Sequence, residues 1–537
     1  MSTANQSGSL RSALKYVPEE LKFGTSGRRG RIVDLTPLEI YVNTLAELEY
    51  LQSLVPSAGG IVRGDDFFFA SDLRPSSPRI AEAVVAAVRD AGMRPVNLGL
   101  IPTPALAYYA VSRGKGSIMV TGSHIPFDRN GYKLNTSCGE LLKQHDGPIN
   151  ERVRKVRDRL YSEPYERSPF DERGGFKAGG RRFPEVQDDA RRAYIARYID
   201  FFGRSPLAGM RLLVYQHSAV GRDILVEILE RLGAEAIPAG RSDAFVPIDT
   251  ENMDAGQMAV IQQLVSDANG PFDAVVSTDG DSDRPLILGI DPANGKIRFF
   301  GGDLVGMIVA DYLGADAVVV PVSCNDAIDL GNLAPALEPK TRIGSPYVIA
   351  GMEAAKRKGR TRVCGWEANG GFLTGTDFER DGAVLTALPT RDAVLPVLGV
   401  LLAARQAGVP LLELFARLPK RFSRAALLKQ FPRPLSERIM ARFSPRSGAT
   451  AAVIEELQSY FPRQSGFSEI AAIDYTDGVR IRFANGEVAH LRPSGNADEF
   501  RIYAVADTQE RADNIAAMGI AEPCGILRQM EAAAMVE

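Results

Sequence analysis

Three aspartates alternate within five residues of one short stretch, STDGDSDRP at 277–285, which follows the apolar segment FDAVV. Asp279, Asp281 and Asp283 would repel one another unless a cation offset their charge. An EF-hand is excluded, because its sixth and twelfth positions would hold Arg and Ile where Gly and Glu are needed. Hard oxygen ligands that leave positions open for phosphate or water favour Mg²⁺. The alternative is a solvated acidic turn.

A serine beside a histidine forms a second candidate, in TGSHIPFDRNGYKL at 121–134. The preceding SIMV is typical of a strand, and sites in α/β sheets collect beyond the carboxyl ends of strands. Ser123 is therefore a candidate nucleophile, although a polar residue at a strand end is the alternative. His124 is a poor general base for it, because neighbours in an extended chain point to opposite faces. A hydrolase elbow of the G-x-S-x-G type is absent.

Two further stretches offer groups that bind anions. RPSGNADEFRIY at 492–503 supplies a compact donor set: Arg492, Ser494, the Gly495 backbone, Asn496 and Arg501. FGTSGRRG at 23–30 is a glycine-rich turn from which Arg28 or Arg29 could reach a phosphate, since a planar guanidinium matches phosphate oxygens. An ordinary surface turn is the alternative for both. The chain contains no phosphate-cradling P-loop, which argues against an ATP-dependent kinase.

A fifth stretch, GWEANGGF at 365–372, is suited to reading a sugar. Glu367 and Asn369 provide a carboxylate and an amide on a loop after a strand, and such groups bind sugar hydroxyls. Trp366 is the only tryptophan and could simply pack in the core.

Strand-like and helical segments alternate around these stretches. The first third of the chain runs strand, helix, strand, helix, strand, as FFFAS, 79–92, RPVNLG, ALAYYAVSRG and SIMVT. Similar units are predicted from 211 to 278 and from 316 to 365. The alternation predicts mainly parallel sheets. The stretch 135–195 reads as a helix near 148–161 followed by an irregular linker.

After about residue 425 the pattern changes to a hairpin with an Asn-Gly turn, DGVRIRFANGEVAHLRPS, and a final helix, TQERADNIAAMGIAE. The sequence therefore predicts an α/β protein with three similar mixed or parallel-sheet α/β domains in series and a smaller C-terminal α+β domain. The predicted division is a mobile N-terminus at 1–20, domain I with the serine loop at 21–190, domain II with the aspartate loop at 191–300, domain III with the sugar-reading loop at 301–425 and domain IV with the phosphate-binding loop at 426–537.

Composition limits the remaining choices. A chain of 537 residues is long enough for several domains, and a net charge of −3 gives no general attraction to nucleic acid or acidic membranes. Four widely spaced cysteines suggest neither a disulfide scaffold nor a CxxC metal site, and they fit a reducing cytoplasm. The N-terminus lacks an apolar signal region. AVLPVLGVLLAA at 393–404 is too short to span a bilayer and predicts a buried helix.

The five stretches, in this order, resemble the α-D-phosphohexomutases, the phosphomannomutase/phosphoglucomutase family. The resemblance runs from about residue 22 to 535, and the serine loop and the DGDSDR loop are its most specific parts. It implies three related α/β domains, a C-terminal α+β domain and a phosphorylated serine. It also implies Mg²⁺, hexose phosphates and a hexose 1,6-bisphosphate intermediate.

The resemblance assigns roles by position. Ser123 matches the phosphorylated serine, and Asp279, Asp281 and Asp283 match the Mg²⁺ ligands, with a phosphoserine oxygen completing the site. The catalytic set is Ser123, Lys133, Arg29 and His124, with Lys133 matching a lysine proposed for acid/base work. The substrate-binding set is Arg284, Glu367 and Asn369 together with Arg492, Ser494, Gly495, Asn496 and Arg501 of the phosphate loop.

Three stretches depart from the family pattern. The usual TASHNP reads TGSHIP here, with Gly122 and Ile125. In the GExSGH sugar loop, Asn369 stands for the serine and Gly371 for a histidine that assists acid/base chemistry in some members. His217 could replace that histidine, or it could be structural. Asn-Ala-Asp-Glu at 496–499 replaces the common Thr-Glu-Pro-Lys and adds negative charge.

The sequence therefore predicts a cytoplasmic, Mg²⁺-dependent phosphohexomutase, monomeric or dimeric, without nucleic-acid or membrane partners. The GWEANGGF and QHSAVGRD stretches resemble phosphomannomutases more than other members of the family, which favours mannose over glucose. Glucose phosphates are the alternative substrates. Two other functions stay open. One is a sugar-phosphate-binding regulator without turnover, against which the intact Ser123 and aspartates argue. The other is a metal-dependent phosphatase, which would not need a loop for a distal phosphate.

Overall fold

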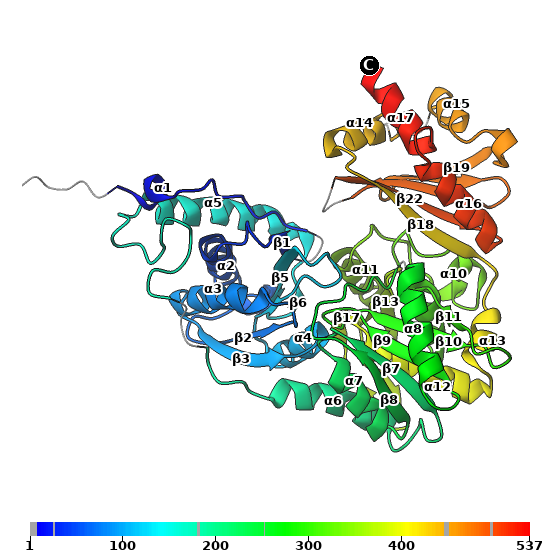
Figure 1. The fold of residues 1–537 in the computed structure, drawn as a ribbon, viewed down its shortest axis with the longest axis horizontal. Helices are drawn as coiled ribbons and strands as arrows, with labels where there is room; N and C mark the ends of the chain where they lie inside the picture. Colours follow the sequence, from blue (N-terminus) through cyan, green and yellow to red (C-terminus); the bar gives the residue numbers. More distant parts are fainter. Residues whose placement is uncertain are drawn as a thin grey trace, which may run out of the picture.

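Within the described residues, the chain forms four large β-sheets, a two-stranded sheet of β15 and β16, and the helices that cover them (Figure 1). The computed structural model describes residues 8–24, 27–179, 183–251, 253–444, 450–494 and 498–536. Single turns of 3₁₀ helix lie at η1 (Pro56–Ala58), η2 (Lys143–His145), η3 (Ala334–Ala336) and η4 (Arg463–Ser465).

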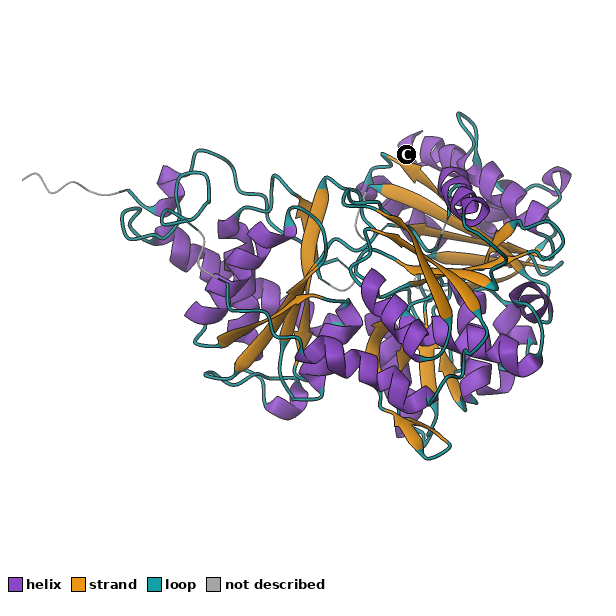
Figure 2. Cartoon of the chain, turned by 60° about the horizontal axis from the view of Figure 1, so that its bottom comes forward, coloured by secondary structure: helices purple, strands orange, loops and turns teal. Residues whose placement is uncertain are grey.

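The first sheet has the strand order β1-β5-β4-β2-β3, with β6 paired to β5. β2 pairs in parallel with β3 and β4, whereas β4, β5 and β1 pair antiparallel, so the sheet is mixed. Figure 2 shows helices packed around these strands. The elements are α1 (Leu10–Ala13), β1 (Arg28–Arg31), α2 (Pro37–Leu51), β2 (Asp66–Ser71), α3 (Ser77–Asp90), β3 (Arg94–Leu100), α4 (Thr103–Val111), β4 (Ser117–Val120), β5 (Arg129–Thr136), β6 (Gly139–Glu140) and α5 (Asp146–Ser162).

The second sheet repeats this arrangement in the order β11-β10-β9-β7-β8. β7 pairs in parallel with β8 and β9, and β10 and β11 follow antiparallel, as β4, β5 and β1 do in the first sheet. The elements are α6 (Asp189–Phe202), β7 (Arg211–His217), α7 (Arg222–Arg231), β8 (Glu235–Arg241), α8 (Ala255–Asp267), β9 (Ala274–Thr278), β10 (Pro285–Ile290) and β11 (Ile297–Phe299).

The third sheet has the order β12-β13-β14-β17, again with a parallel pair followed by antiparallel strands. The repeat predicted from the alternating pattern is therefore present in the topology. The elements are α9 (Gly302–Leu313), β12 (Ala317–Val319), α10 (Ala327–Leu330), α11 (Ser345–Arg357), β13 (Val363–Trp366), β14 (Phe372–Thr374), β15 (Phe378–Arg380), β16 (Ala383–Leu385), β17 (Leu388–Asp392), α12 (Val394–Ala407) and α13 (Leu411–Ala416).

The fourth sheet is antiparallel throughout, in the order β18-β22-β21-β20-β19, and the predicted hairpin is β20–β21. Helices cover it on one side, and together they form the α+β unit that the sequence predicts (Figure 1). The elements are β18 (Phe422–Lys429), α14 (Arg433–Phe443), α15 (Ala451–Ser459), β19 (Ile470–Asp474), β20 (Val479–Phe483), β21 (Val488–Pro493), β22 (Glu499–Ala506), α16 (Gln509–Ile520) and α17 (Ile526–Val536).

Local signals in the sequence fix where several helices begin and end. Thr36 caps α2 by accepting a hydrogen bond from the Glu39 amide, with Pro37 at the first helical position. α12, the apolar segment predicted as a buried helix, ends at Gly408, whose φ of 66° is the left-handed conformation that stops a helix.

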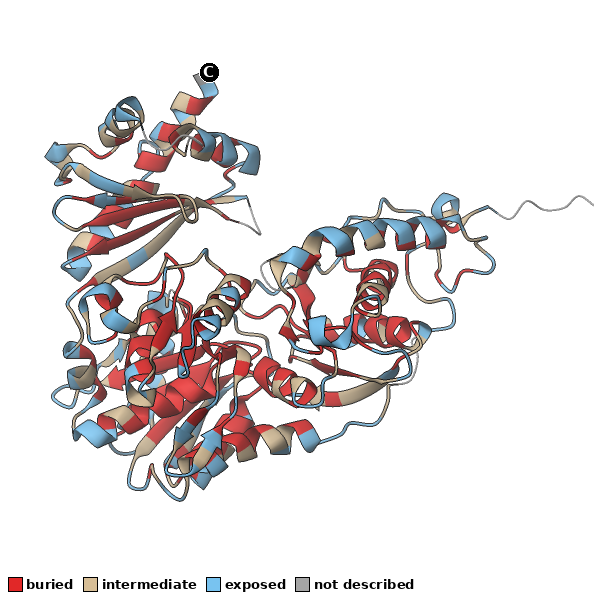
Figure 3. Ribbon diagram, turned by 180° about the vertical axis from the view of Figure 1, so that it is seen from behind, coloured by how far each residue is buried: buried red, intermediate tan, exposed pale blue. Residues whose placement is uncertain are grey.

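One continuous apolar core links the first three sheets, and a separate core lies under the fourth. Phe68 of the first sheet, Val276 of the second and Trp366 of the third belong to the shared core. Figure 3 shows buried residues filling the strands and inward helix faces, with exposed residues on the outer faces. Because α4 packs on β2 of the first sheet and on β17 of the third, and α12 packs on β10 of the second, this shared core holds the loops at the strand ends in fixed relation.

Four details differ from the sequence-based expectations. Leu10 of α1 is buried and its amide donates to the Glu163 carbonyl, so part of the segment predicted to be mobile packs on the fold. α6 begins at Asp189, inside the predicted linker, and α17 follows the helix predicted to be last. The predicted boundary at 425 falls within β18. Within the part of the chain that the structure describes, every helix is too short or too polar to cross a membrane.

Candidate active site

Ser123 lies in the loop between β4 and β5, with a buried side chain. Its φ of 54° is in the left-handed region, a conformation that costs a non-glycine residue about 1–3 kcal/mol. The Ser123 amide donates to Thr121 Oγ1 over 2.7 Å, which stabilises this turn. Because the backbone is not extended here, the argument that His124 points away from Ser123 does not hold. His124 Nδ1 lies 3.5 Å from Ser123 Oγ.

Arg74, which sequence reasoning did not select, fixes the serine loop from the turn after β2. Its guanidinium donates to the backbone carbonyls of Ser123 at 2.9 Å and Pro126 at 3.0 Å, and it lies over the Phe245 ring. A Cβ at Gly122 would lie 2.6 Å from Arg74 Cζ. The departure from the alanine of TASHNP therefore has a steric reason, because the guanidinium takes the volume that an alanine methyl group would need.

The aspartate loop, residues 279–284, connects β9 to β10 and is fixed by hydrogen bonds within the loop and from His217. Asp279 Oδ1 accepts hydrogen bonds from the amides of Asp283 and Arg284, which folds the loop around that carboxylate. His217 Nε2 donates to the Thr278 carbonyl over 2.8 Å. His217 is fully buried and supports the loop from beneath, which is the structural role that the sequence left open.

Ser123 and the three aspartates come together although more than 150 positions separate them. Ser123 Oγ donates to Asp279 Oδ2 over 2.7 Å. Each aspartate places one carboxylate oxygen within 4.8 Å of the others, and all three are fully buried. Within the described residues, Asp281 Oδ1 and Asp283 Oδ1 are buried without a hydrogen-bond partner. Because unpartnered buried carboxylate oxygens are costly, this donor set fits a hard divalent cation.

Lys133 neutralises part of this charge. Its ammonium donates to Asp281 Oδ2 at 2.6 Å and to Asp283 Oδ2 at 2.5 Å, and its side chain is only 6% exposed. β5 carries Lys133 to this point beside β4, which ends at the serine loop. Thr103, at the start of α4, donates a further hydrogen bond to Asp281.

The three carboxyl groups titrate differently. Burial and the charges of Asp281 and Asp283 raise the pKa of Asp279 well above its ordinary value. Burial opposes ionisation of the other two as well, but their cationic neighbours outweigh it. Lys133 lowers the pKa of Asp281, and Arg391 together with Lys133 lowers that of Asp283. The cationic neighbours therefore favour the ionised forms of Asp281 and Asp283, whereas burial beside two like charges disfavours the ionised form of Asp279.

Cationic side chains surround the aspartates. Arg284 Nε lies 3.7 Å from Asp283 Oδ1. Burial and the charge of Arg284 lower the pKa of Arg29 to about 10 and hold the pKa of His124 well below its usual value, so the His124 ring is neutral near pH 7. Arg28, the other arginine of FGTSGRRG, is buried in an ion pair with Glu47 at 2.6 Å and is structural.

The sugar-reading loop follows β13. Trp366 packs in the core, where its Nε1 donates to the Asp303 carbonyl over 3.0 Å. Asn369 Oδ1 accepts the Gly371 amide at 3.0 Å, which leaves the amide nitrogen of its side chain as the donor available to a ligand. Arg391, at the end of β17, holds Glu367: Arg391 Nη1 lies 3.1 Å from Glu367 Oε2. No sequence motif pointed to Arg391.

The phosphate loop joins β21 to β22, and its arginines already pair with acids. Arg492 lies 3.0 Å from Asp477, and Arg501 lies 2.9 Å from Glu499, one of the negative charges that distinguish this loop from the family pattern. The Ser494 amide donates to the Glu499 carbonyl. Gly495 and Asn496 lie outside the described residues.

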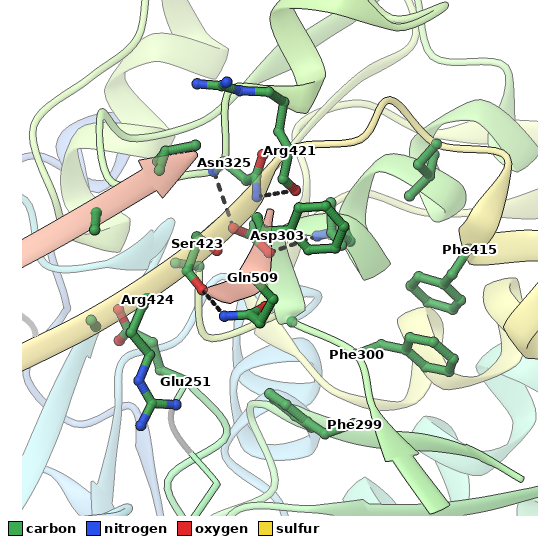
Figure 4. A pocket seen from close by; sticks show the side chains of 18 of the residues that line it. Glu251, Phe299, Phe300, Asp303, Asn325, Phe415, Arg421, Ser423, Arg424 and Gln509 are labelled. Atoms are coloured by element: carbon green, nitrogen blue, oxygen red, sulfur yellow. Dashed lines mark hydrogen bonds between the residues drawn. The ribbon is translucent and has the colours of Figure 1, made fainter. Parts of the chain in front are cut away.

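A cavity of about 570 Å³ lies between β18 and β22 of the fourth sheet and the segments around β11, α9 and α13 (Figure 4). Asp303, Asn325 and Ser423 line one side, with Glu251 nearby and the stacked rings of Phe300 and Phe415 opposite. Neither Ser123 nor the three aspartates line it. Glu251 lines this cavity and also interacts electrostatically with Arg284 of the aspartate loop. Burial and Asp249 raise the pKa of Glu251 to about 7, and the Arg501 and Arg284 charges partly oppose this.

Comparison with known proteins supplies the family. The chain matches models for phosphoglucomutase/phosphomannomutase alpha/beta/alpha domain I over 20–159, alpha/beta/alpha domain III over 301–422 and the C-terminal domain over 435–521. It is 37% identical over 502 residues to the phosphomannomutase of Sinorhizobium fredii, covering 93% of this chain and 98% of that protein. This chain belongs to the phosphoglucomutase/phosphomannomutase family.

Solved phosphohexomutase structures share the fold. A phosphoglucomutase/phosphomannomutase family protein from Burkholderia thailandensis superimposes with a TM-score of 0.65 at 18% identity, covering 97% of this chain and 98% of that one. An N-acetylphosphoglucosamine mutase from Aspergillus fumigatus, in complex with GlcNAc-6P and magnesium, gives a TM-score of 0.59 at 15% identity, with coverage of 97% and 98%. At these identities the likeness concerns the fold.

Of the residues selected from sequence, the phosphohexomutase fold gathers Ser123, Lys133 and the three aspartates into direct contact, and Arg284 lies at their edge. Glu367 joins them through Arg391. Arg74, Arg391 and Glu251 were missed, because each comes from a stretch without a recognisable motif. The only available signal was indirect: Gly122 and Gly371, where the sequence departs from the family pattern, are the glycines that contact Arg74 and Arg391.

Proposed function

We propose that this protein interconverts hexose 6-phosphate and hexose 1-phosphate through a phosphorylated Ser123, with mannose phosphates as the favoured substrates. The observation that carries the proposal is the contact between Ser123 Oγ and Asp279 at 2.7 Å inside a cluster that Lys133 completes. A hydroxyl nucleophile, a carboxylate cluster and a buried ammonium are the parts that phosphoryl transfer needs, because its catalysis rests on positioning and on charge stabilisation.

In the first half-reaction, the bond between phosphorus and Ser123 Oγ breaks as phosphorus bonds to the free hydroxyl oxygen of the bound sugar phosphate. The hydroxyl proton passes to a basic side chain, and Ser123 Oγ gains a proton, which regenerates the serine hydroxyl. The neutral ring of His124 is the candidate that accepts the sugar proton, and the ammonium of Lys133 is the candidate that returns a proton to Ser123 Oγ. A bisphosphorylated sugar results, and no water or inorganic phosphate is consumed.

In the second half-reaction, the sugar has turned over without leaving, and Ser123 Oγ attacks the other phosphate. That phosphorus–oxygen bond breaks, the sugar oxygen takes the proton that Oγ gives up, and Ser123 is phosphorylated again. We assign Arg492, Ser494 and Arg501 to the phosphate that does not react, since guanidinium groups match phosphate oxygens. The unreacting end must be held in both orientations for the exchange to occur.

The cation of the aspartate cluster is, we propose, Mg²⁺, held by Asp279, Asp281 and Asp283 with a phosphoserine oxygen. When bound, it would spread the charge that develops on the transferred group. The hard oxygen donors and the two unpartnered carboxylate oxygens support this choice. The magnesium named for the related Aspergillus mutase is consistent with it.

Mannose is the proposed sugar because the relative that is 37% identical is a phosphomannomutase. Glu367 and the amide nitrogen of Asn369 are the groups that would read the hydroxyl pattern. A cytoplasmic location is proposed with it, supported by four free thiols, two of them buried. A monomeric or dimeric state stays a prediction.

A coupled assay tests the proposal. The protein is supplied with Mg²⁺ and a trace of hexose 1,6-bisphosphate and given mannose 1-phosphate or glucose 1-phosphate in parallel. We expect turnover of both, with a higher kcat/KM for mannose 1-phosphate. A higher kcat/KM for glucose 1-phosphate would assign the alternative sugar. Release of inorganic phosphate instead of isomerised sugar would make the protein a phosphatase, and no turnover with no phosphate on Ser123 would favour a binding protein.

A further inference from the structure

Arg391 lies between the aspartate loop and the sugar-reading loop and binds both. Its Nε and Nη2 donate to Asp283 Oδ2 at 3.1 and 3.0 Å, and its Nη1 donates to Glu367 Oε2 at 3.1 Å. Nη1 also donates to Ser345 Oγ at 2.9 Å. The side chain is 3% exposed. A buried guanidinium that shares its donors between two carboxylates fixes the distance between them.

The elements around Arg391 leave it little freedom. Ser345 donates to Glu140 of β6 at 2.6 Å, and Thr390, beside Arg391, donates to the other oxygen of the same carboxylate at 2.6 Å. The next residue, Asp392, accepts hydrogen bonds from Tyr194 and Tyr198 of α6. Strand β17 therefore presents Arg391 from a backbone that is anchored to both the first and the second unit of the fold.

Gly371 explains why the guanidinium can reach both loops. A Cβ at Gly371 would lie 2.5 Å from Arg391 Cδ and 2.7 Å from its Cγ. Gly371 is the position that corresponds to the histidine of the GExSGH pattern. In this chain the aliphatic part of Arg391 occupies the volume next to the backbone where that side chain would start. Arg391 can therefore take this position only because residue 371 has no side chain.

We propose that Arg391 is a positioning residue that couples the aspartate loop to the sugar-reading loop, so that cation binding at Asp283 changes how Glu367 is held. The coupling follows from electrostatics. The guanidinium of Arg391 is shared between the carboxylates of Asp283 and Glu367. A divalent cation at Asp283 would repel the guanidinium and neutralise the Asp283 carboxylate, which shifts Arg391 toward Glu367. The proposal deepens the proposed function and rests on it for the identity of the sugar, but the coupling itself involves only this chain and Mg²⁺.

The chain contains its own probe for this coupling. Trp366 is the single tryptophan and is the residue directly before Glu367. Mg²⁺ is titrated into the unphosphorylated protein without sugar, with binding followed by calorimetry and the sugar loop followed by Trp366 fluorescence. In the wild type we expect both signals to report the same Kd. In Arg391→Lys, whose ammonium lacks the fork needed to span both carboxylates, we expect Mg²⁺ still to bind while the fluorescence response falls at least about fivefold.

Two further variants separate coupling from general damage. Arg197→Lys changes another buried arginine, which bonds to the Thr386 carbonyl, and it should keep the Trp366 response. Gly371→Ala leaves Arg391 in place but pushes its side chain, and it should weaken the response even if Arg391→Lys does not fold. Gly147→Ala is the matched control, since nothing lies within 4 Å of a Cβ there.

The outcomes are distinguishable. Wild-type protein that binds Mg²⁺ without a fluorescence change, or that binds no Mg²⁺, overturns the coupling, as do equal responses in wild type, Arg391→Lys and Gly371→Ala. Loss of the response in both variants with retention in both controls supports it. A failed mutase assay alongside an intact Trp366 response to Mg²⁺ would sink the proposed function and leave the coupling standing.

Discussion

Ser123 Oγ donates a hydrogen bond of 2.7 Å to Asp279 Oδ2, between two loops that lie 156 positions apart in the sequence. The contact joins the carboxyl end of β4 in the first sheet to that of β9 in the second. It places the candidate nucleophile against the candidate cation site before either phosphate or cation is bound. Such prior positioning matters for phosphoryl transfer, because the protein accelerates this reaction mainly by positioning the reacting groups and stabilising charge.

Replacing Ser123 by Ala should lower turnover at least about 1,000-fold, because no other hydroxyl takes its place against Asp279. Steady-state kinetics on mannose 1-phosphate measures the change. The exposed Ser53→Ala serves as control and should leave turnover unchanged. Near wild-type turnover in Ser123→Ala would exclude a phosphoserine mechanism at this position.

Replacing Lys133 by Met should destabilise the metal-free protein by about 3–5 kcal/mol, because Asp281 and Asp283 would lose a buried counter-charge. The same change removes the ammonium that competes with a cation for these oxygens. Saturating Mg²⁺ should therefore raise the Tm of Lys133→Met more than that of the wild type. Thermal denaturation with and without Mg²⁺ provides the comparison, and an equal shift in the two proteins would argue against a shared site.

Adding a methyl group at Gly122 should disturb the serine loop through Arg74. The new Cβ would meet the buried guanidinium at 2.6 Å, and the carbonyl of Ser123 that Arg74 holds would move with it. We expect Gly122→Ala to lower kcat about tenfold or more, since small displacements at a reacting centre are costly. Gly147→Ala should have no effect, and unchanged kcat in Gly122→Ala would show that Arg74 can move freely.

Acid should destabilise the protein through His217. Burial lowers the pKa of His217 to about 4, against an ordinary value of 6.5. Because the unfolded state binds this proton first, the stabilisation is present above pH 6.5 and is lost as the pH falls toward 4. It amounts to on the order of 3 kcal/mol.

Urea unfolding between pH 4 and 7 tests this linkage. His217→Gln should show a shallower loss of stability across that range than the wild type. Equal slopes in the two proteins would mean that His217 does not control the acid limb. His490, whose pKa burial also lowers to about 4, offers a second site for the same comparison.

Sequence patterns predicted the repeated sheets and singled out the serine loop and the aspartate loop as candidates, because these features depend on local signals. Apolar runs such as SIMV become buried strands wherever helices cover both faces, and the loops that follow carry the chemistry. The aspartate spacing alone indicated a cation. These inferences needed no knowledge of how distant segments meet.

The sequence did not predict the contacts made by long side chains from stretches that contain no recognisable motif. Arg74 and Arg391 act through hydrogen bonds to loops 49 and 108 positions away. Nothing in DLRPSSP or LPTRDAV indicates these contacts. The turn at Ser123 also escaped prediction, because a positive φ in a serine depends on Thr121 and Arg74 rather than on its own propensity.

A single-turnover experiment tests the central claim most directly. Protein phosphorylated on Ser123 by hexose 1,6-bisphosphate is mixed with excess mannose 1-phosphate and Mg²⁺, quenched at short times and analysed for phosphoserine, sugar phosphates and inorganic phosphate. The account predicts that bisphosphorylated sugar forms as phosphoserine is lost, that mannose 6-phosphate follows as phosphoserine returns, and that inorganic phosphate stays at background. Phosphoserine that is stable in the presence of mannose 1-phosphate, or that decays to inorganic phosphate at the rate of turnover, would contradict it.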